Sequence, residues 1–232
     1  MIWVANQLVG CRFENNPDNA NGDVFTEIGS VSYRDGASGR EVDLSASGAL
    51  IEMVDENYVG SQLHGAGAVT IAAWVEVTTI APDRQTIVSI PNHFPSSGAG
   101  IIMEIRDNNG LEIRGRSRGG ISDPNQNLRV QDVFAVGEKY YCVGVWNFAN
   151  KELILYVNGE EIGRETNISW PTSTYSHTSG DTPHPCTIGA HFARFNAPRY
   201  FSGYIDELSI YRTGLNFFDI KRIMHGLHPL NG

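Results

Sequence analysis

The sequence predicts an all-β protein: an antiparallel two-sheet β-sandwich closed by one short C-terminal helix, with residues 1–232 forming a single domain. Apolar residues recur in strand-length segments, most clearly VTIAAWVEV at 69–77, YYCVGVWN at 140–147 and ELILYVNGEEIG at 152–163. The 25 glycines suit the many turns of such a fold. Helix start and stop signals stand together near the C-terminus, at 215–226.

The strand that precedes this helix changes its apolar parity. Phe201 and Ile205 fall on odd positions, whereas Leu208 and Ile210 fall on even positions. One extra residue near position 206 or 207 accounts for the shift, because side chains alternate strictly along a regular strand. We therefore predict a β-bulge at that point.

The helix has a clear signal at each end. Asn216 is a good N-cap, and Asp219 lies in the first turn near the positive end of the helix dipole. Leu215 and Ile220 have the spacing of a hydrophobic staple, and Gly226 stands where a C-cap glycine belongs. A helix this short needs tertiary packing. We expect it to dock on a sheet through Phe218, Ile220 and Ile223.

These stretches together resemble a known family. The run FSGYIDELSIY followed by LxxxDI is similar to the last strand and helix of laminin-G-like, concanavalin A-like jelly-roll domains, and 69–77, 140–147 and 152–163 match in the right order. The resemblance covers the chain from Val69 on. It implies a jelly-roll sandwich, and it is specific for fold and not for activity, because such folds host many functions.

The first of two predicted hairpins gives an expected strand register. A loop at Asn108-Asn109-Gly110 predicts opposite charges on the exposed side and aliphatic pairs inside. The predicted pairs are Arg106 with Glu112, Glu104 with Arg114, and Ile105 with Ile113. The alternative is a charged catalytic or anion-binding patch that Arg116 and Arg118 join.

An Asn158-Gly159 type I′ turn predicts that Leu155 faces Ile162. The segment 69–77 is apolar on both faces, which is typical of a central strand. Trp74 in it is read as a core anchor, with a sugar-stacking platform as the alternative. We expect Trp74, Val143 and Ile210 to press the two layers together.

Composition excludes several classes of partner. A net charge of −9 argues against duplex nucleic acid and against anionic membrane surfaces. No apolar run has the length of a membrane span, and the N-terminus MIWVANQLVG lacks the features of a signal peptide. The three cysteines, Cys11, Cys142 and Cys186, predict reduced thiols, or at most one fortuitous pair.

The loop NNPDNANGD at 15–23 is dense in oxygen ligands. Asp18, Asn21 and Asp23 are candidates for a structural Ca²⁺ site. Domains of the resembled family often hold calcium near such a loop, sometimes with the aspartate of the closing strand, which is Asp206 here. The alternative is ordinary Asx-turn chemistry, in which these side chains bond their own backbone.

The segment 167–185 has nearly no strand pattern, and loops of that length are usually functional. Aromatic rings beside hydrogen-bonding groups are what a sugar-binding surface needs. The alternative is a loop packed on its own domain or on a neighbouring subunit. The candidate ligand-binding residues are Phe94, Trp170, Tyr175, His177, Asp181 and His184.

An enzyme is the second class considered. The E-x-D-x-x-E run of one jelly-roll hydrolase family is absent. A polysaccharide lyase needs a base and a cation, and the chain offers a set for this role, although its spacing does not demand it. That set is His191, Arg194, Tyr200 and Tyr204.

The sequence thus favours a non-catalytic binding or adhesion module that recognises surface glycans or cell-surface polysaccharide. A Met1 start, no leader and unpaired thiols predict a phage or viral virion surface protein, in a fibre or capsid decoration, located extracellularly or on the virion; the alternative explanation is a signal segment trimmed from this chain. Other virion subunits or a homo-oligomer are the expected protein partners. The alternatives are a carbohydrate-active enzyme of the lyase or hydrolase type and a purely structural assembly subunit.

Overall fold

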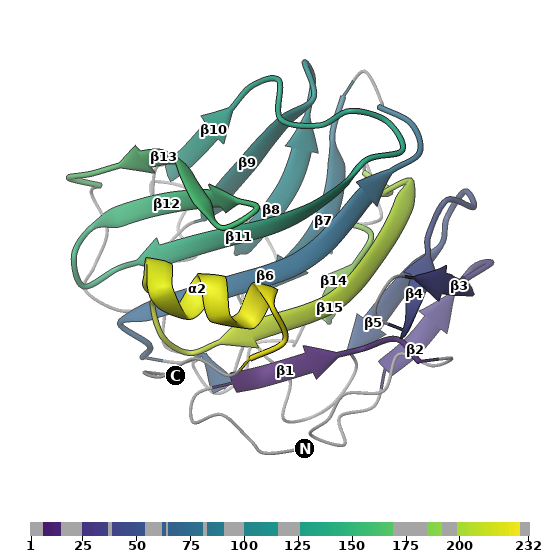
Figure 1. Ribbon diagram of the computed structural model, residues 1–232, viewed down its shortest axis with the longest axis horizontal. Coiled ribbons are helices and arrows are strands. Elements are labelled where there is room, and N and C mark those ends of the chain that lie inside the picture. Colours follow the sequence, from purple (N-terminus) through teal and green to yellow (C-terminus); the bar gives the residue numbers. More distant parts are fainter. Residues whose placement is uncertain are drawn as a thin grey trace, which may run out of the picture.

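A computed structural model describes residues 7–14, 25–36, 39–53, 62–63, 65–80, 83–90, 100–115, 126–168, 185–191 and 199–227. Two antiparallel sheets face each other across one hydrophobic core, and a short helix lies on the outside of one of them (Figure 1). This confirms the predicted all-β sandwich with a C-terminal helix. Within the described residues, no helix is long and apolar enough to cross a membrane.

The first layer, here called the β6 sheet, is built around three long central strands. Among the described residues its strands run in the order β13-β12-β11-β6-β15-β4-β3, and β1 also pairs with β15. Their bounds are β13 (Glu160–Glu165), β12 (Glu152–Val157), β11 (Lys139–Asn147), β6 (Ala68–Val77), β15 (Gly203–Tyr211), β4 (Gly39–Asp43), β3 (Ser32–Gly36) and β1 (Gln7–Cys11).

The second layer is here called the β8 sheet, and its strand pairing has fewer register shifts than that of the β6 sheet. Its described strands run in the order β10-β9-β8-β7-β14-β5-β2. Their bounds are β10 (Gln126–Val130), β9 (Gly110–Gly115), β8 (Ile101–Arg106), β7 (Gln85–Ile90), β14 (Cys186–Ile188), β5 (Leu50–Met53) and β2 (Phe25–Ile28).

The core between the sheets consists of the inward-facing half of every long strand. Ile71, Met103, Ile113 and Ile210 are all buried in it. Trp146 on β11 is also fully buried, and its Nε1 donates to the carbonyl of Arg114 on β9 at 3.2 Å. This bond joins the two layers, because β11 and β9 belong to different sheets.

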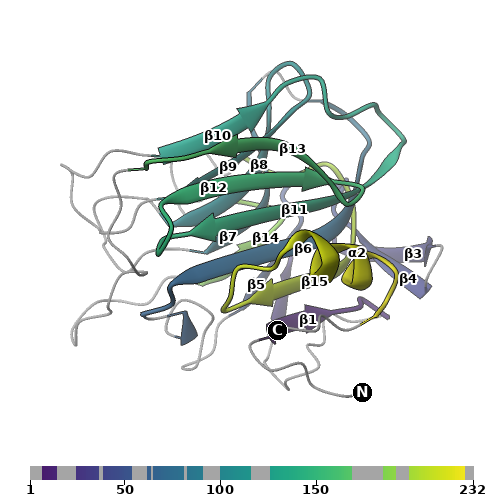
Figure 2. The same ribbon diagram turned by 60° about the vertical axis from the view of Figure 1, so that its left-hand side comes forward.

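A second hydrophobic cluster lies on the outer face of the β6 sheet, under helix α2 (Phe217–Met224) (Figure 2). Trp74 and Val143 belong to this cluster, whereas Ile210 belongs to the core between the sheets. The expectation that these three side chains share one core was therefore wrong. The strands are apolar on both faces because the helix covers the outer one.

Helix α2 begins and ends as the sequence predicts. Asn216 accepts hydrogen bonds from the amides of Phe218 and Asp219, and its own Nδ2 donates to Asp219 Oδ2 at 2.8 Å. Gly226 has φ +70°, and the amides of Gly226 and Leu227 close a Schellman motif on the last turn. Ile220 is fully buried in the cluster below, next to Leu215.

The docking face of α2 is narrower than predicted. Ile223 packs against the outer cluster as expected, but Phe218 is 73 % exposed. Positions 218 and 220 are two apart, so their side chains leave a helix in very different directions. Phe218 therefore points away from the face that buries Ile220.

The predicted bulge in β15 is confirmed. The register with β6 shifts between Asp206 and Ser209, and Glu207 adopts φ +47°. The extra residue lets Ile205 and Leu208 both face the inter-sheet core. As a consequence, the two adjacent carboxylates are turned to the outer side of the β6 sheet.

The register of the β8–β9 hairpin differs from the prediction. The loop is residues 107–109, one residue earlier than expected, with Asn108 and Asn109 at φ +56° and +52°. Asparagine tolerates this left-handed region, so the turn needs no glycine there. Glu104 consequently faces Glu112 instead of Arg114, and Ile105 faces Leu111.

The β12–β13 hairpin is partly as predicted. Asn158 and Gly159 have φ +51° and +77°, which confirms the type I′ turn. Leu155 faces Gly163 and not Ile162, because the register shifts between Leu155 and Tyr156. The irregularity leaves Ile162 out of the pairing.

Candidate functional site

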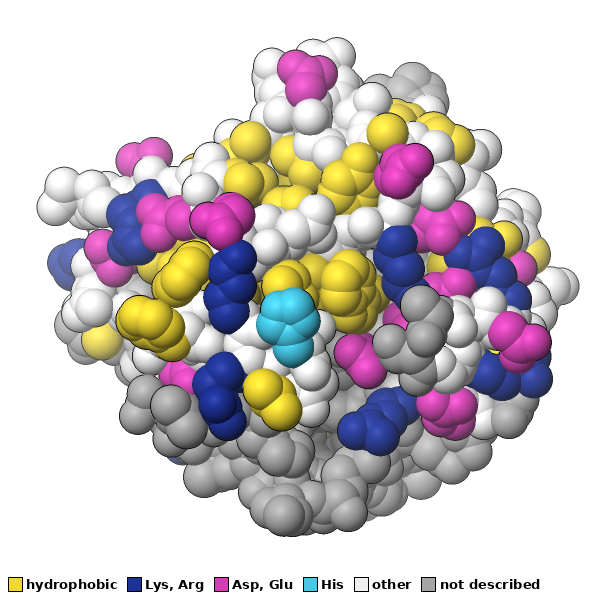
Figure 3. All heavy atoms as spheres, in the orientation of Figure 1, with side chains coloured by type: hydrophobic (Ala, Val, Ile, Leu, Met, Phe, Trp, Pro, Cys, Tyr) yellow, Lys and Arg dark blue, Asp and Glu magenta, His cyan; other side chains and the backbone are white. Residues whose placement is uncertain are grey.

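Two hollows flank helix α2 on the outer face of the β6 sheet. Figure 3 shows this face, where hydrophobic side chains are exposed among acidic and basic ones. The hollow beside the N-terminal end of α2 is here called the phenylalanine hollow, and the one beside its C-terminal end is called the tyrosine pocket. Both exist because the helix crosses the sheet and fills only part of its outer surface.

The phenylalanine hollow has a volume of about 340 Å³, within the range of small-molecule sites. Its floor is apolar and comes from β11 and β12, while β13 and the helix start supply the polar and aromatic rim. It is lined by Val145, Asn147, Ile154, Tyr156, Glu161, Arg164, Gly214, Leu215, Asn216 and Phe217.

One side of this hollow is an exposed aromatic ring. Phe217 is 39 % exposed, and Phe218 packs edge-on against it with ring centroids 5.6 Å apart. Lys221 Nζ lies 5.3 Å from the Phe217 ring centroid and pairs with Glu160 at 2.6 Å. These contacts hold the ring in place at the rim.

The opposite side is a fixed ion pair. Arg164 donates from Nε and Nη2 to the two carboxylate oxygens of Glu161, at 2.9 and 2.7 Å, and from Nη1 to Glu152 at 3.1 Å. The Arg164 hydrogen bonds lower the pKa of Glu161, so the carboxylate stays charged. Tyr156 completes the network by donating its hydroxyl to Glu161 at 3.4 Å.

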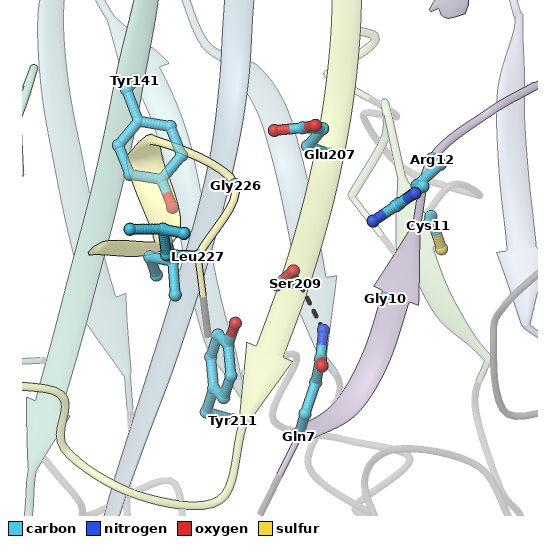
Figure 4. Close-up of a pocket in the computed structure, with 11 residues that line it drawn as sticks. Gln7, Gly10, Cys11, Arg12, Tyr141, Glu207, Ser209, Tyr211, Gly226 and Leu227 are labelled. Atoms are coloured by element: carbon cyan, nitrogen blue, oxygen red, sulfur yellow. Dashed lines mark hydrogen bonds between the residues drawn. The ribbon is translucent and has the colours of Figure 1, made fainter. Parts of the chain in front are cut away.

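The tyrosine pocket is smaller and more polar (Figure 4). Its volume of about 90 Å³ equals roughly three water molecules, so a ligand would insert only part of itself. It lies between β1, β11, β15 and the end of α2. Its lining residues are Gln7, Gly10, Cys11, Arg12, Tyr141, Glu207, Ser209, Tyr211, Ile223, Gly226 and Leu227.

Hydroxyl, amide and charged groups converge on the tyrosine pocket. Gln7 Nε2 donates to Ser209 Oγ at 3.2 Å, and the Tyr141 and Tyr211 rings line the same pocket (Figure 4). Burial raises the pKa of Tyr211 to about 12 and that of Tyr141 well above its ordinary value. Both phenols therefore stay neutral and serve as hydrogen-bonding groups.

Glu207 is the acidic residue of the pocket, and its backbone adopts a positive φ. Burial and the neighbouring Asp206 raise its pKa, while Arg12, Lys139 and a hydrogen bond from Trp74 oppose that shift. A non-glycine residue at positive φ carries a conformational cost, which surrounding structure must offset. The bulge thus places the Glu207 carboxylate at this pocket, whereas the Asp206 carboxylate lies outside it.

That neighbour, Asp206, belongs to a separate ion network. Its carboxylate lies 3.3 Å from Lys139 Nζ and accepts the amide of Glu207 at 2.8 Å. Burial raises the pKa of Asp206, and Lys139 opposes the shift. Lys139 also pairs with Glu41 at 2.6 Å, and Arg34 joins Glu41 at 2.5 Å and stacks over Tyr204.

The predicted calcium ligands are only partly visible. Asp206 is engaged by Lys139 as above, while Asp18, Asn21 and Asp23 lie outside the described residues. Among the described residues, no group of three His, Cys, Asp or Glu side chains is placed to hold a metal ion. The calcium site therefore stays a prediction.

Two of the residues proposed for a lyase, Tyr204 and His191, do not come together. Tyr204 lies on the outer face of the β6 sheet beneath Arg34, whereas His191 follows β14 and lies near Arg114 of the β8 sheet. The two layers of the sandwich separate them. Arg194 lies outside the described residues.

The six predicted glycan-binding residues also fall outside the part of the chain that is described: Phe94, Trp170, Tyr175, His177, Asp181 and His184. Sequence reasoning missed both hollows beside α2. One available signal was the tandem Phe217-Phe218 at the helix start, because the face that buries Ile220 cannot accept both rings. The Glu161–Arg164 pair gave no comparable signal, since it depends on the bulge in the β12–β13 hairpin.

Comparison with known proteins places the chain in a family. The family profile of the concanavalin A-like lectin/glucanases superfamily matches residues 54–221. The chain therefore belongs to this superfamily, in agreement with the laminin-G-like resemblance seen in the sequence. No match is found among curated proteins.

Two kinds of protein are found among the solved structures that share this fold. Domain 4 of AbnA, a GH43 extracellular arabinanase from Geobacillus stearothermophilus, solved with arabinotriose, has a TM-score of 0.66 and 18% identity, over 93% of this chain and 97% of that one. The binding domain of botulinum neurotoxin DC, solved with SialylT, has a TM-score of 0.64 and 12% identity, over 96% of this chain and 51% of that one.

The binding domain of botulinum neurotoxin serotype D is similar in the same way, with a TM-score of 0.63 and 13% identity, over 95% of this chain and 52% of that one. The chain thus spans about half the length of the toxin domains that it matches. At these identities the likeness establishes the shared fold.

Proposed function

We propose that this chain is a non-catalytic carbohydrate-binding module and that the phenylalanine hollow is its sugar site. The observation that carries the proposal is an exposed aromatic ring facing a fixed ion pair across a hollow of about 340 Å³. A sugar ring presents C–H groups on one face and hydroxyls at its edge. Phe217 suits the first, and the Glu161–Arg164 pair suits the second.

The charged pair recognises neighbouring hydroxyls because it offers acceptors and donors side by side. Glu161 oxygens accept from one hydroxyl, and Arg164 N–H groups donate to the next. The pair is held by Tyr156 and Glu152 before any ligand arrives, which reduces the entropy lost on binding. The AbnA domain, with the same fold and nearly the same length, was solved with a bound arabinotriose, which supports the assignment of a saccharide ligand.

The test is a binding screen with neutral oligosaccharides, arabinotriose included, followed by calorimetry on variants. Phe217→Ala is expected to weaken binding by about tenfold through the lost ring contact. Val136→Ala is the control: it removes most of an exposed apolar side chain from a residue that does not line the hollow. Equal losses in both variants, or bond cleavage of any bound sugar, would contradict the proposal.

A surface role fits this function. We propose, as the sequence suggested, a place on an extracellular or virion surface, in a phage fibre or capsid decoration, with glycans or cell-surface polysaccharide as ligands. What supports this is the superfamily membership and the saccharide site proposed above. Immunogold labelling of purified source particles tests it: labelling on the particle surface is expected, and signal confined to the cell interior would contradict it.

A structural Ca²⁺ held by Asp18, Asn21 and Asp23 also remains a proposal. Its support is the density of oxygen ligands in 15–23. A melting temperature that falls when EGTA is added, and recovers with excess Ca²⁺, is the expected result. Identical melting curves with and without EGTA would contradict the proposed calcium site.

A further inference from the structure

The outer face of the β8 sheet holds a carboxylate surrounded by arginines. Glu104 is fully buried, and guanidinium groups from four parts of the chain lie within salt-bridge distance of it. From Glu104 Oε1, Arg114 Nε is 3.2 Å away, Arg84 Nη1 3.3 Å and Arg106 Nη1 3.5 Å, and Arg199 Nη1 is 3.6 Å from Oε2. One carboxylate therefore serves as counter-ion to four cations.

The second acid in the cluster, Glu112, lies where its charged form is disfavoured. Glu112 faces Glu104 directly across β8 and β9. Burial raises the pKa of Glu112, the charge of Glu104 raises it further, and the two carboxyl groups share a hydrogen bond. Two like carboxylates in one buried place disfavour the charged form of Glu112, and even as two carboxylates Glu104 and Glu112 would face four arginines.

The remaining acids lie at the edge, and of the four arginines around Glu104 they pair only with Arg84 and Arg106. Asp107, 49 % exposed, is 3.4 Å from Arg106 and also pairs with Arg129, and the exposed Asp83 is 4.0 Å from Arg84. Among the described residues, Arg114 and Arg199 have no carboxylate within salt-bridge distance other than Glu104 and Glu112. The cluster has more buried positive charge than it neutralises, and buried charges need partners.

Hydrogen-bond donors in the cluster also lack acceptors. Within the described part of the chain, Arg114 Nε and Arg199 Nη1 lie close to Glu104 without the geometry of a hydrogen bond, and Thr86 Oγ1 is a buried atom without a hydrogen-bond partner. Thr86 is fully buried and lies opposite Glu104 on the neighbouring strand β7. An unsatisfied buried donor destabilises a fold, so three around one carboxylate indicate that an acceptor normally joins them.

Three further features of the cluster are compatible with a bound anion. Arg199 is held at φ +48°, a conformation uncommon for a residue other than glycine, while its carbonyl accepts the amide of Thr86 at 2.9 Å. Burial and the surrounding arginines lower the pKa of His191 to about 3, so the histidine adds no proton to the site. Arg84 and Arg199 keep 24% and 23% of their side chains exposed, which leaves them within reach of solvent.

We propose that Arg84, Arg114, Arg199 and Thr86 form an oxyanion-binding site that takes the carboxylate or sulfate group of an acidic saccharide. Guanidinium groups match the planar oxygens of a carboxylate, and sulfate offers the same acceptors. The site lies on the opposite layer of the sandwich from the phenylalanine hollow. The proposal therefore does not rest on the sugar site assigned above.

The test measures binding of trigalacturonic acid, its fully methyl-esterified form and sodium sulfate to the full chain at one matched ionic strength. The acid is expected to bind and the ester is not, because esterification removes the charge and keeps the shape. Arg199→Asn is expected to weaken binding by about tenfold. Asparagine tolerates the positive φ at position 199, so the variant removes the guanidinium with little strain.

Arg40→Gln is the matched control, since it removes one guanidinium from β4 of the other sheet and is expected to leave the affinity unchanged. Thr86→Val keeps the buried shape, removes one donor and is expected to weaken binding a few-fold. If sulfate alone binds and Arg199→Asn weakens it, the site stands with a sulfated ligand. Absence of binding to both anions, or equal affinities in Arg199→Asn and Arg40→Gln, overturns the proposal.

Discussion

The two outer faces of this sandwich are built by the same strand alternation and hold opposite chemistry. On the β6 sheet, the outward side chains of β11 and β12 include Tyr141, Val143 and Ile154, and helix α2 covers them. On the β8 sheet, the outward positions include Glu104, Glu112 and Thr86, which are also buried. Burial on the outside of a sheet therefore does not by itself imply an apolar face.

The difference lies in what each face requires of its surroundings. The apolar face is satisfied by any well-packed cover, and α2 supplies it with one buried anchor, Ile220. The charged face needs specific partners, because each buried ion or donor must meet its complement. We therefore expect single substitutions on the charged face to have the larger effects, and this expectation can be tested directly.

Glu104→Leu is expected to be the most damaging change. It removes the carboxylate shared by four arginines and lowers the free energy of unfolding by about 3–5 kcal/mol, as happens when one partner of a buried ion pair is lost. Urea unfolding followed by tryptophan fluorescence measures the loss. Glu104→Gln, which keeps a hydrogen-bonding group, should lose less. A midpoint equal to that of the wild type would show that the arginines do not depend on Glu104.

Ile220→Ala tests the apolar face. It removes the fully buried anchor of α2 and is expected to lower the free energy of unfolding by about 2–4 kcal/mol. Phe218→Ala, at an exposed position of the same helix, should cost much less. The two faces would have to be regarded as equivalent if Ile220→Ala proved as damaging as Glu104→Leu.

His191 gives the charged face a pH dependence. Its pKa is lowered from 6.5 to about 3, first by burial and then by Arg199, Arg114 and Arg84. Below pH 6.5 the unfolded chain binds a proton that the folded chain does not, so stability is present above pH 6.5 and is lost as the pH falls toward 3. The loss is about 1.4 kcal/mol for each pH unit.

Melting temperatures of wild type and His191→Asn between pH 7 and 4 check this, with the shallower pH slope expected for the variant. Glu112 has the opposite sign, because its raised pKa favours the protonated folded form as pH falls. Comparing the two proteins cancels the Glu112 contribution to first order. Parallel pH curves would mean that His191 is free to accept a proton in the folded state.

The smallest expected effect is at the end of α2. Gly226 has φ +70°, and no described atom lies within 4 Å of the position that a Cβ would take there. Gly226→Ala therefore meets no clash and carries only the conformational cost of about 1 kcal/mol. Thermal unfolding at pH 7 measures it. An unchanged melting temperature would indicate that the Schellman motif adds nothing to docking on the apolar face.

Local signals predicted the fold well. The parity shift in 200–211 located the bulge, and Asn216 and Gly226 located both ends of the helix, because each depends on a few neighbouring residues. The predicted register of β8 with β9 was wrong by two residues. Asn108 and Asn109 both adopt left-handed conformations, so the loop ends at residue 109. From the sequence alone, Gly110 was the more obvious residue for the left-handed position.

The candidate sites were harder to predict because they combine distant segments. The phenylalanine hollow joins β11, β12, β13 and the start of α2, and the oxyanion site joins β7, β8 and β9 with Arg199. Sequence patterns show which face of one strand a residue takes, but not which strands become neighbours. Trp74 and Val143 illustrate this: both pack in a hydrophobic cluster as expected, and both were assigned to the wrong one.

The cysteines have a practical consequence. Cys11, Cys142 and Cys186 are buried, and burial raises the pKa of Cys142 and brings that of Cys186 to about 12. Since the thiolate is the reactive form, neither Cys142 nor Cys186 offers a nucleophile while the chain is folded. The sandwich thus holds together without crosslinks in reducing or oxidising surroundings, and alkylation of its thiols would report unfolding.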